Sequence, residues 1–316
     1  MQIYAHLEQL PPEENGCAVA MGYFDGLHIG HRAVIDAAIR WARAHAAAPA
    51  VFTFSLPRGD TLKGGRLLDT DYKHHLAEQM GVRYYTAPAF AEFRALSPEA
   101  FVAELAEKMH ARALCCGENF TFGAGAAGNV PLLRGLCAAR GIELIVAPTA
   151  EFEGKAVSST RIRTALAGGD IPAVNAMLGQ PYTIRFPVQH GQGLGHTLGF
   201  PTINQIFPEE YQLPRGGIYI TRTCIDGRSW PSATGLGSRP TVSSDASHIT
   251  CETFIPDFHG MLYGETPAVS FYAYLSPERR FSSLAELQAC IRDAAARARQ
   301  YFAEESHKTV AFCPVE

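Results

Sequence analysis

The feature that most constrains the fold is a regular alternation of strand-like and helix-like segments over the first half of the chain. Short apolar runs have the composition of buried strands at 17–24, 49–55, 82–88, 111–117 and 142–148. Longer segments with apolar residues at helical spacing lie between them, at 31–47, 71–81, 97–110 and 129–141. Strands that alternate with helices through short links are typical of a doubly wound parallel sheet. We therefore predict an α/β domain, followed by two further short helices over 158–179.

The second half of the chain has a different pattern. After about residue 181, Gly and Pro recur, and short alternating runs replace the helices at 182–189, 200–204, 217–226, 229–237, 251–258 and 267–275. Several short strands separated by turn signals favour a β-barrel or a β-sandwich. An amphipathic segment at 282–305 predicts a C-terminal helix. We place the boundary near "LGQPYT", with one domain at 1–180 and a second at 181–316.

Charge, hydropathy and cysteine usage narrow the classes of function. Lys and Arg total 27 against 31 Asp and Glu, a formal net charge of −4, and no basic stripe typical of nucleic-acid binders is evident. Neither a secretory signal nor an apolar run of about 18 residues is found. The eight cysteines are scattered and form no C-x-x-C pair, which favours reduced thiols in a cytoplasmic protein. We expect small-molecule substrates and no nucleic-acid or membrane partner, and no pattern indicates an oligomeric state.

The link "DGLHIGH" joins a strand that ends near Phe24 to a helix that begins near His31. In doubly wound sheets, ligands collect at such links, where helix N-termini favour anions. Two imidazoles at His28 and His31 would suit a triphosphate, and Gly30 would let the backbone come close. A second segment, "SSTRIR" at 158–163, opens a helix with good capping residues and two arginines, for which an anion partner would account. The alternative is that these are ordinary helix starts.

A glycine-rich stretch, "HGQGLGHTLGFPTIN" at 190–204, opens the second domain. Backbone N–H groups of such a loop can bind phosphates, and the glycines are Gly191, Gly193, Gly195 and Gly199. Thr202 and Asn204 are two residues apart on the strand that follows, so their side chains share one face. A hydroxyl and an amide oxygen form a modest site for Mg²⁺, which also binds substrate phosphates. The alternative is a glycine-rich hairpin with surface Thr and Asn.

The motifs "GYFDGLHIGH", "GENFTFG" and "SSTRIR" resemble the paired signatures of the HxGH nucleotidyltransferases. Together with the second domain, they resemble the bifunctional bacterial riboflavin kinase/FAD synthetases. The resemblance implies a Rossmann-like nucleotidyltransferase domain that moves AMP from ATP onto FMN to give FAD. It also implies an ATP site formed by Gly22, Phe24, Asp25, His28, His31, Asn119, Ser159, Thr160 and Arg163.

The stretch at 190–204 resembles the riboflavin kinase signature, and four later motifs match the rest of that domain in order. They are "LPRGGIY" (213–219), "GLGSRPTV" (235–242), "CETFIPDFHGMLYG" (251–264) and "LSPERRF" (275–281). The resemblance implies a six-stranded Greek-key barrel that phosphorylates riboflavin with MgATP. It assigns phosphate binding to the glycine-rich loop, Mg²⁺ to Thr202 and Asn204, and the catalytic base to Glu252, a role that suits a carboxylate beside a metal–phosphate site.

The chain departs from the family pattern at cationic positions of the first domain. "TFSLPRG" (53–59) lacks the usual histidine, and "FTFGAGAAG" (120–128) has Thr121 and Ala126 where Arg is common. Arg58 and Arg161 are candidate substitutes, and we expect FAD synthesis to be slow. The alternative is a riboflavin kinase whose first domain only binds nucleotide or acts as a scaffold. A class I aminoacyl-tRNA synthetase is disfavoured because no K-M-S-K-S run exists, and a pure flavin-binding module is disfavoured by the chemistry-bearing Thr202, Asn204 and Glu252.

Overall fold

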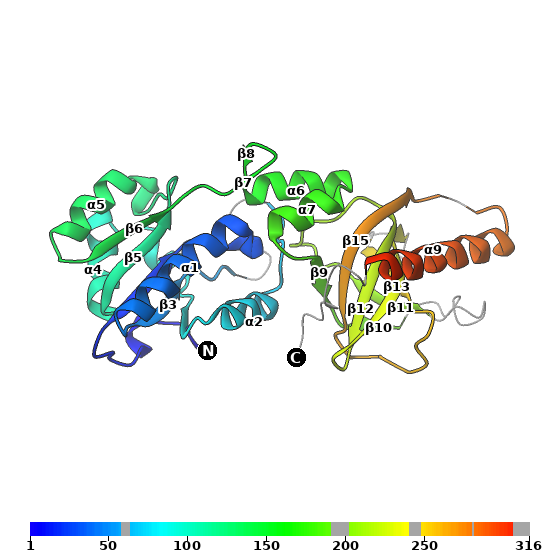
Figure 1. Cartoon of the computed structure of the whole chain (residues 1–316), viewed down its shortest axis with the longest axis horizontal. Coiled ribbons are helices and arrows are strands. Elements are labelled where there is room, and N and C mark those ends of the chain that lie inside the picture. The colour runs from blue at the N-terminus through cyan, green and yellow to red at the C-terminus, as the bar shows by residue number, and fades with distance from the viewer. Residues whose placement is uncertain (58–63, 191–201, 240–247, 280, 306–316) are drawn as a thin grey trace. The chain divides into compact units, whose positions relative to one another are not determined.

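A computed structural model of the chain describes residues 1–57, 64–190, 202–239, 248–279 and 281–305 (Figure 1). The chain divides into two compact units. The first unit consists of Met1–Leu62 and Thr70–Ser159, and the second unit consists of Lys63–Asp69 and Thr160–Glu316. The second unit therefore contains a short segment that comes from within the first half of the sequence.

A six-stranded sheet forms the centre of the first unit, and all its strand pairs are parallel. The strand order across the sheet is β1-β4-β3-β2-β5-β6. The strands are β1 (Gln2–Tyr4), β2 (Cys17–Met21), β3 (Ala48–Phe52), β4 (Tyr84–Thr86), β5 (Ala111–Gly117) and β6 (Glu143–Ala147). The chain adds strands on one side of β2 and then on the other, so the topological switch point lies between β2 and β5.

The first unit has five described α-helices; four of them start within about two residues of their predicted positions, whereas the third, a four-residue helix, was not predicted. They are α1 (Ile29–Ala44), α2 (Thr70–Met80), α3 (Phe90–Phe93), α4 (Pro98–Lys108) and α5 (Val130–Ala138). Ser97 caps α4 and Asn129 caps α5, each accepting a hydrogen bond from a backbone N–H in the first turn, and each helix has Pro near its start. After β6, the chain forms a small hairpin of β7 (Glu151–Phe152) and β8 (Lys155–Ala156).

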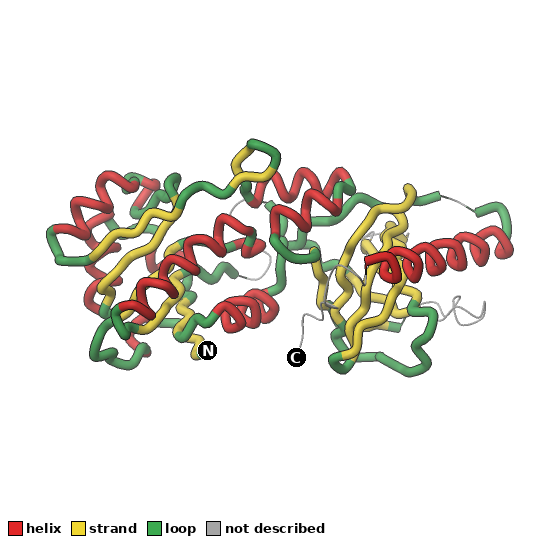
Figure 2. Tube along the Cα trace, in the orientation of Figure 1, coloured by secondary structure: helices red, strands yellow, loops and turns green. Residues whose placement is uncertain are grey.

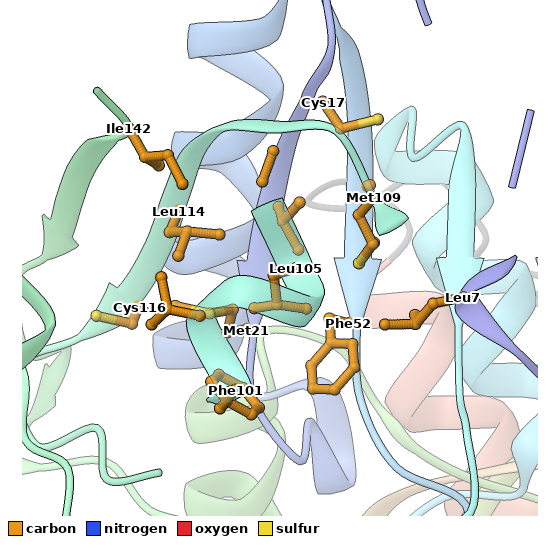
Figure 3. Close-up of a cluster of buried hydrophobic side chains, with 14 of the residues drawn as sticks. Leu7, Cys17, Met21, Phe52, Phe101, Leu105, Met109, Leu114, Cys116 and Ile142 are labelled. Atoms are coloured by element: carbon orange, nitrogen blue, oxygen red, sulfur yellow. The ribbon is translucent and has the colours of Figure 1, made fainter. Parts of the chain in front are cut away.

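The core of the first unit lies between the sheet and helices α4 and α5. Alternate residues of β2 and β5 point into it, and Phe101 and Leu105 of α4 pack against them (Figure 3). The cluster includes Cys17, Val19, Met21, Leu114, Cys116, Leu133 and Cys137. Helix α1 packs on the sheet along β2, β3, β5 and β6. Each large apolar side chain buried in this way contributes about 1.5–3 kcal/mol, and together they hold the carboxyl ends of β2 and β5 in place.

A curled antiparallel sheet forms the second unit, and its described strands number seven, in the order β10-β11-β14-β13-β12-β15-β9. They are β9 (Tyr182–Arg185), β10 (Val188–Gln189), β11 (Thr202–Ile206), β12 (Gly217–Ile225), β13 (Arg228–Arg239), β14 (His248–Phe254) and β15 (Ala268–Pro277). Strands β12 to β14 form a meander, and β15 returns to pair with β12, which is a Greek-key connection. The curled sheet and its loops are visible in Figure 2.

The strand count differs from the predicted six because the run at 182–189 forms two strands rather than one. Phe186 and Pro187 separate β9 from β10, and Pro has no N–H with which to continue a ladder. β9 pairs with β15 at one edge of the sheet, whereas β10 pairs with β11 at the other. Because only two residues join them, the two edges must curl toward each other, which is how the sheet approaches a barrel.

The interior of this sheet holds a chain of hydroxyl groups. Thr221 lies 2.9 Å from Ser232 and 2.8 Å from Thr234, measured between side-chain oxygens. Thr223 also bonds Ser232, and Thr234 bonds Thr253. All five residues are fully buried. A one-residue slip between strands would bury these hydroxyls without partners, so the network favours a single register.

Three helices and one inserted segment complete the second unit as described. The helices are α6 (Ser159–Gly168), α7 (Ile171–Leu178) and α9 (Leu284–Glu305). In the inserted segment, the Arg66 N–H donates to the Glu210 carbonyl oxygen at 2.7 Å, and the Gln212 N–H donates to the Arg66 carbonyl oxygen at 2.9 Å. The sequence pattern did not predict this contact, because a single β-bridge leaves no periodicity to recognise.

The predicted fold class is confirmed: a Rossmann-like parallel sheet is followed by an antiparallel barrel-type sheet and a C-terminal helix. Six cysteines of the described residues carry free thiols.

Candidate active sites

The candidate nucleotide-binding residues of the first unit lie at the carboxyl ends of two neighbouring strands. β2 ends at Met21 and β5 ends at Gly117, and these strands pair across the switch point. The link that begins at Gly22 leaves β2 there, and Asn119 follows β5 by two residues. Ligands of open parallel sheets bind in this crevice. The strand before the link is β2, the second along the chain. The edge strand β1 precedes it and has only three residues, too few to recognise from a sequence pattern.

The link between β2 and α1 has an unusual backbone. Phe24 and Leu27 have φ angles of 51° and 43°, and Gly26 between them has 82°. A non-glycine residue in this region costs about 1–2 kcal/mol, and such strain clusters at functional sites. Burial holds Phe24 in place, and its ring meets the His31 ring edge-on, with centroids 5.4 Å apart. A Cβ at Gly22 would lie 2.9 Å from the Phe24 ring, so glycine is needed there.

His28 is the N-cap of α1. Its Nδ1 accepts a hydrogen bond from the His31 backbone N–H at 3.3 Å, and the helix begins at Ile29, two residues earlier than its predicted start near His31. The two imidazole rings stack with centroids 3.5 Å apart. A Cβ at Gly30 would lie 3.3 Å from the His28 ring and 3.8 Å from the Ala150 Cβ. The first turn of α1 therefore packs closely against the segment that follows β6.

Both histidines are neutral at neutral pH. Burial lowers the pKa of His28 from 6.5 to about 4. Burial also lowers the pKa of His31 well below 6.5, with smaller contributions from the charges of His28 and Lys73. The Nδ1 atom of His31 is buried and has no hydrogen-bond partner among the residues that the structure describes. A bound phosphate would supply a partner for this ring and would raise both pKa values.

The remaining residues predicted to bind ATP are divided between the first unit and the second unit. The Ser159 hydroxyl donates to the Asp25 carbonyl oxygen at 3.1 Å, and both residues belong to the first unit. Asn119 is exposed at the end of β5. Thr160 and Arg163 belong to the second unit, where the buried Arg163 donates from Nε to the Gly65 carbonyl oxygen at 2.7 Å. The structure thus gives Arg163 a main-chain partner in the inserted segment.

The predicted kinase residues that are described share one face of the second sheet. Asn204 of β11 is the direct cross-strand partner of Glu252 of β14, and Thr202 lies two residues before Asn204. Directly opposite residues on antiparallel strands have Cβ atoms about 4.5–5.5 Å apart. Gly235 of β13 is the partner of Glu252 on its other side. The structure therefore brings a carboxylate, an amide and a hydroxyl to one face beside a strand position without a side chain.

The donor atoms of this face fit a hard cation. The Oδ1 atom of Asn204 is buried and has no hydrogen-bond partner in the described residues. An amide oxygen left in this state costs about 1–3 kcal/mol, which a metal ion would recover. Oxygen donors from Asn and Thr are the kind that Mg²⁺ accepts alongside phosphate oxygens. Gly191, Gly193, Gly195 and Gly199, together with Arg58, lie outside the described residues.

Two residues near the first site were missed by the sequence analysis. Lys73 of α2 lies close enough to His31 for its charge to lower the pKa of that ring. Glu118, next to Asn119, accepts hydrogen bonds from Thr149 after β6. Nothing in the sequence pattern marks these two residues as functional, because a lysine on a helix and a glutamate in a turn are common at exposed positions.

The sheet with its HxGH link and the barrel with its Asn–Glu pair define a two-domain protein of nucleotidyltransferase and flavokinase type. Residues 10–161 match the family described as FAD synthetase, and residues 178–302 match the family described as riboflavin kinase. The chain belongs to the family of bifunctional riboflavin kinase/FMN adenylyltransferases. The curated protein of that name from Pseudomonas fluorescens is 33% identical, over 98% of this chain and 100% of its own length.

Other relatives agree with this assignment, and a solved structure shares the fold. Proteins of the same name from Bacillus subtilis and Escherichia coli K12 are 30% and 32% identical, each over 94% of this chain and 96% of its own length. The crystal structure of a macrolide-efflux protein from Streptococcus pneumoniae has a TM-score of 0.82 at 24% identity, over 94% of this chain and 98% of that chain. At this identity, the likeness shows the fold alone. The presence of both domains supports the prediction of two activities over the kinase-only alternative.

Proposed function

We propose that the second unit phosphorylates riboflavin with MgATP to give FMN, and that the first unit transfers AMP from ATP to FMN to give FAD. The observation that carries the proposal is the direct pairing of Asn204 with Glu252 across β11 and β14. In this pair, a carboxylate that can accept a proton lies opposite an amide oxygen that can bind a cation. Phosphoryl transfer to a hydroxyl needs these two groups next to each other.

In the kinase reaction, Glu252 accepts the proton of the ribityl 5′-hydroxyl while the hydroxyl oxygen bonds to the γ-phosphorus of ATP, and ADP leaves. Thr202 and Asn204 would hold Mg²⁺, which neutralises charge on the transferring phosphate. The backbone beside Glu252 is open at Gly235, where the nearest atom to an added Cβ is 4.0 Å away. Backbone N–H groups of the loop containing Gly191, Gly193, Gly195 and Gly199 would bind the ATP phosphates.

In the adenylyl transfer, a phosphate oxygen of FMN bonds to the α-phosphorus of ATP, and pyrophosphate leaves. The neutral rings of His28 and His31 would donate hydrogen bonds to phosphate oxygens and gain positive charge as the phosphates approach. Gly22, Phe24 and Asp25 shape the link around them. We further assign ATP binding to Asn119, Ser159, Thr160 and Arg163.

The domain limits, the compartment and the partners belong to this proposal as well. Adenylyltransferase and kinase domains at 1–180 and 181–316 are supported by the two matched ranges. The acidic net charge of −4 favours small-molecule substrates over nucleic acid, and a biosynthetic role fits the cytoplasm. None of the helices in the described part of the chain combines the length and apolar character that crossing a membrane requires.

The test is incubation of the protein with riboflavin, ATP and Mg²⁺, followed by chromatographic separation of FMN from FAD. We expect FMN to form first and FAD to follow slowly. FMN without FAD at any enzyme concentration would contradict the adenylyltransferase half of the proposal. Absence of both products would contradict the whole.

A further inference from the structure

A hydrogen-bonded pair lies beside the proposed adenylyltransferase site and has no role in the functions assigned above. Glu118 follows β5 directly, and Thr149 follows β6 by two residues. The Thr149 backbone N–H donates to Oε2 of Glu118 at 3.2 Å, and the Thr149 hydroxyl donates to the same oxygen. β5 and β6 are neighbours in the sheet. The pair therefore fastens the carboxyl ends of two adjacent strands next to the switch point.

Thr149 begins a segment that runs along the candidate ATP site. The carbonyl oxygen of the next residue, Ala150, accepts a hydrogen bond from the Val157 N–H at 2.9 Å. The Ala150 side chain faces Gly30 in the first turn of α1. The segment ends at Ser159, whose hydroxyl bonds the Asp25 carbonyl oxygen. The segment is thus anchored to the rest of the first unit at its beginning and at its end.

Most residues between the two anchors are exposed, whereas Val157 is buried. Glu151, Lys155 and Ala156 of the β7–β8 hairpin are exposed, as are Glu153 and Gly154 in its turn. A segment with few buried apolar contacts opens at low free-energy cost. The position of Ala150 against α1 therefore depends on the hydrogen bond from Val157 and on the two anchors, and the Glu118 pair is the anchor nearer to Ala150.

We infer that Glu118 is a positioning residue for ATP in the adenylyl transfer, acting through Thr149. A carboxylate is not a ligand for a triphosphate, and here one of its oxygens accepts both donors of Thr149. Its effect is to hold Ala150 opposite the first turn of α1, so that the ATP site is formed before ATP binds. Preorganisation of this kind improves binding by lowering the ordering cost. The inference rests on the proposed adenylyltransferase activity of the first unit.

The experiment compares Thr149→Val with Thr149→Ser in the full-length protein. Valine keeps the shape of threonine and removes the hydroxyl donor, whereas serine keeps the donor. With FMN as substrate, we expect Thr149→Val to raise the KM for ATP in FAD formation about tenfold, the scale of one charge-assisted hydrogen bond. The kcat should stay within about threefold, and Thr149→Ser should match the parent. FMN formation from riboflavin by the same preparations should be unchanged in both variants.

A double-mutant cycle tests whether Glu118 acts through Thr149. We expect Glu118→Ala to raise the KM for ATP in FAD formation, and Glu118→Ala combined with Thr149→Val to be no worse than Glu118→Ala alone. Additive effects would overturn the pairing. Equal KM values for Thr149→Val and Thr149→Ser would overturn the positioning role, as would a loss confined to kcat.

If the parent makes no FAD, the proposed function fails, and a separate measurement decides the inference. Amide hydrogen exchange of residues 148–157 is then measured with and without ATP and Mg²⁺. The inference requires ATP to slow exchange in Thr149→Ser more than in Thr149→Val. The same response in both variants, including no response in either, overturns it.

Discussion

The imidazole rings of His28 and His31 stack with centroids 3.5 Å apart and ring planes inclined by 19°. Two charged rings at this distance would repel each other, and the burial of His28 and partial burial of His31 disfavour protonation, so the free protein keeps both rings neutral. A triphosphate bound beside them, as we propose, would reverse this balance, because its negative charge favours the protonated rings. In this proposal the two rings become positive only when nucleotide is present.

The first prediction concerns the pH dependence of stability. Between pH 6.5 and about 4, the unfolded chain binds a proton at each of these histidines and the folded first unit does not. Acidification across this window therefore favours unfolding, on the order of 1 kcal/mol per pH unit for each ring. The contribution of the two neutral rings to the free energy of unfolding is fully present above pH 6.5 and is lost as the pH falls toward 4. Urea unfolding, followed by Trp41 fluorescence in a Trp230→Phe background, measures this for the first unit.

The matched variant is His28→Asn with His31→Gln, in which asparagine can still cap α1 but neither side chain titrates. We expect its stability to depend less on pH across the same window. The exposed His6→Gln should keep the dependence of the parent. An unchanged slope in His28→Asn with His31→Gln would show that the two rings are already protonated in the folded protein.

The second prediction separates the two activities. The double substitution His28→Ala with His31→Ala should lower FAD formation from FMN by about 10²–10³-fold, because it removes the donors to the triphosphate. FMN formation from riboflavin should be unaffected, since Asn204 and Glu252 lie in the second unit. Both rates are measured on one preparation by chromatography. A parallel fall in FMN formation would contradict the separation of the sites.

Much of the fold was predictable because its periodicity is strong. Apolar residues at helical spacing over 97–110 and 129–141 predicted α4 and α5, and in the structure Ser97 and Asn129 cap these helices. The misses were of another kind. β1 has three residues at a sheet edge, and the division of 182–189 into β9 and β10 depends on which distant strands each half pairs with. Pairing over long sequence separations leaves no local pattern.

The candidate sites were predictable in part for the same reason. The glycine and histidine motif marked the link after β2, but its position at the switch point depended on β5 lying beside β2. Thr202 and Asn204 were placed on one face by strand periodicity. That Asn204 lies opposite Glu252 could not be predicted without the register between β11 and β14. Glu118 gave no signal at all, because its function is defined by Thr149, 31 residues away.

The third prediction tests the proposed base. Glu252→Gln should lower the kcat of FMN formation by about 10²–10⁴-fold, because it keeps the size of the side chain and removes the proton acceptor. Its thermal unfolding should match that of the parent. The exposed Glu209→Gln in the same unit serves as a control with the same loss of charge. A Glu252→Gln rate within threefold of the parent rate would remove Glu252 from this role.

The fourth prediction concerns the cation. Thr202→Ala and Asn204→Ala should raise the Mg²⁺ and ATP concentrations required for FMN formation. Asn204→Ala should be the more severe, since the buried Oδ1 of Asn204 has no hydrogen-bond partner among the described residues. Riboflavin affinity, measured by quenching of flavin fluorescence, should change less than ATP use. Unchanged Mg²⁺ and ATP dependence in both variants would show that the cation is held elsewhere.

The fifth prediction concerns the inserted segment at 64–69. A Cβ at Gly65 would lie 2.5 Å from the Gln212 backbone nitrogen and 2.7 Å from the Tyr211 carbonyl carbon, and backbone atoms cannot rotate away as a side chain can. Gly65→Ala should therefore destabilise the second unit by about 1–3 kcal/mol, as measured by urea unfolding with Trp230 fluorescence in a Trp41→Phe background.

The control for Gly65 is Gly168→Ala at the end of α6. No atom lies within 4 Å of a Cβ there, and alanine favours a helix over glycine by up to about 1 kcal/mol. We expect this variant to be as stable as the parent or slightly more so. If Gly65→Ala unfolds at the same urea concentration as Gly168→Ala, the segment moves away without cost. In that case the hydrogen bond from Arg163 to the Gly65 carbonyl oxygen does not hold the segment in place.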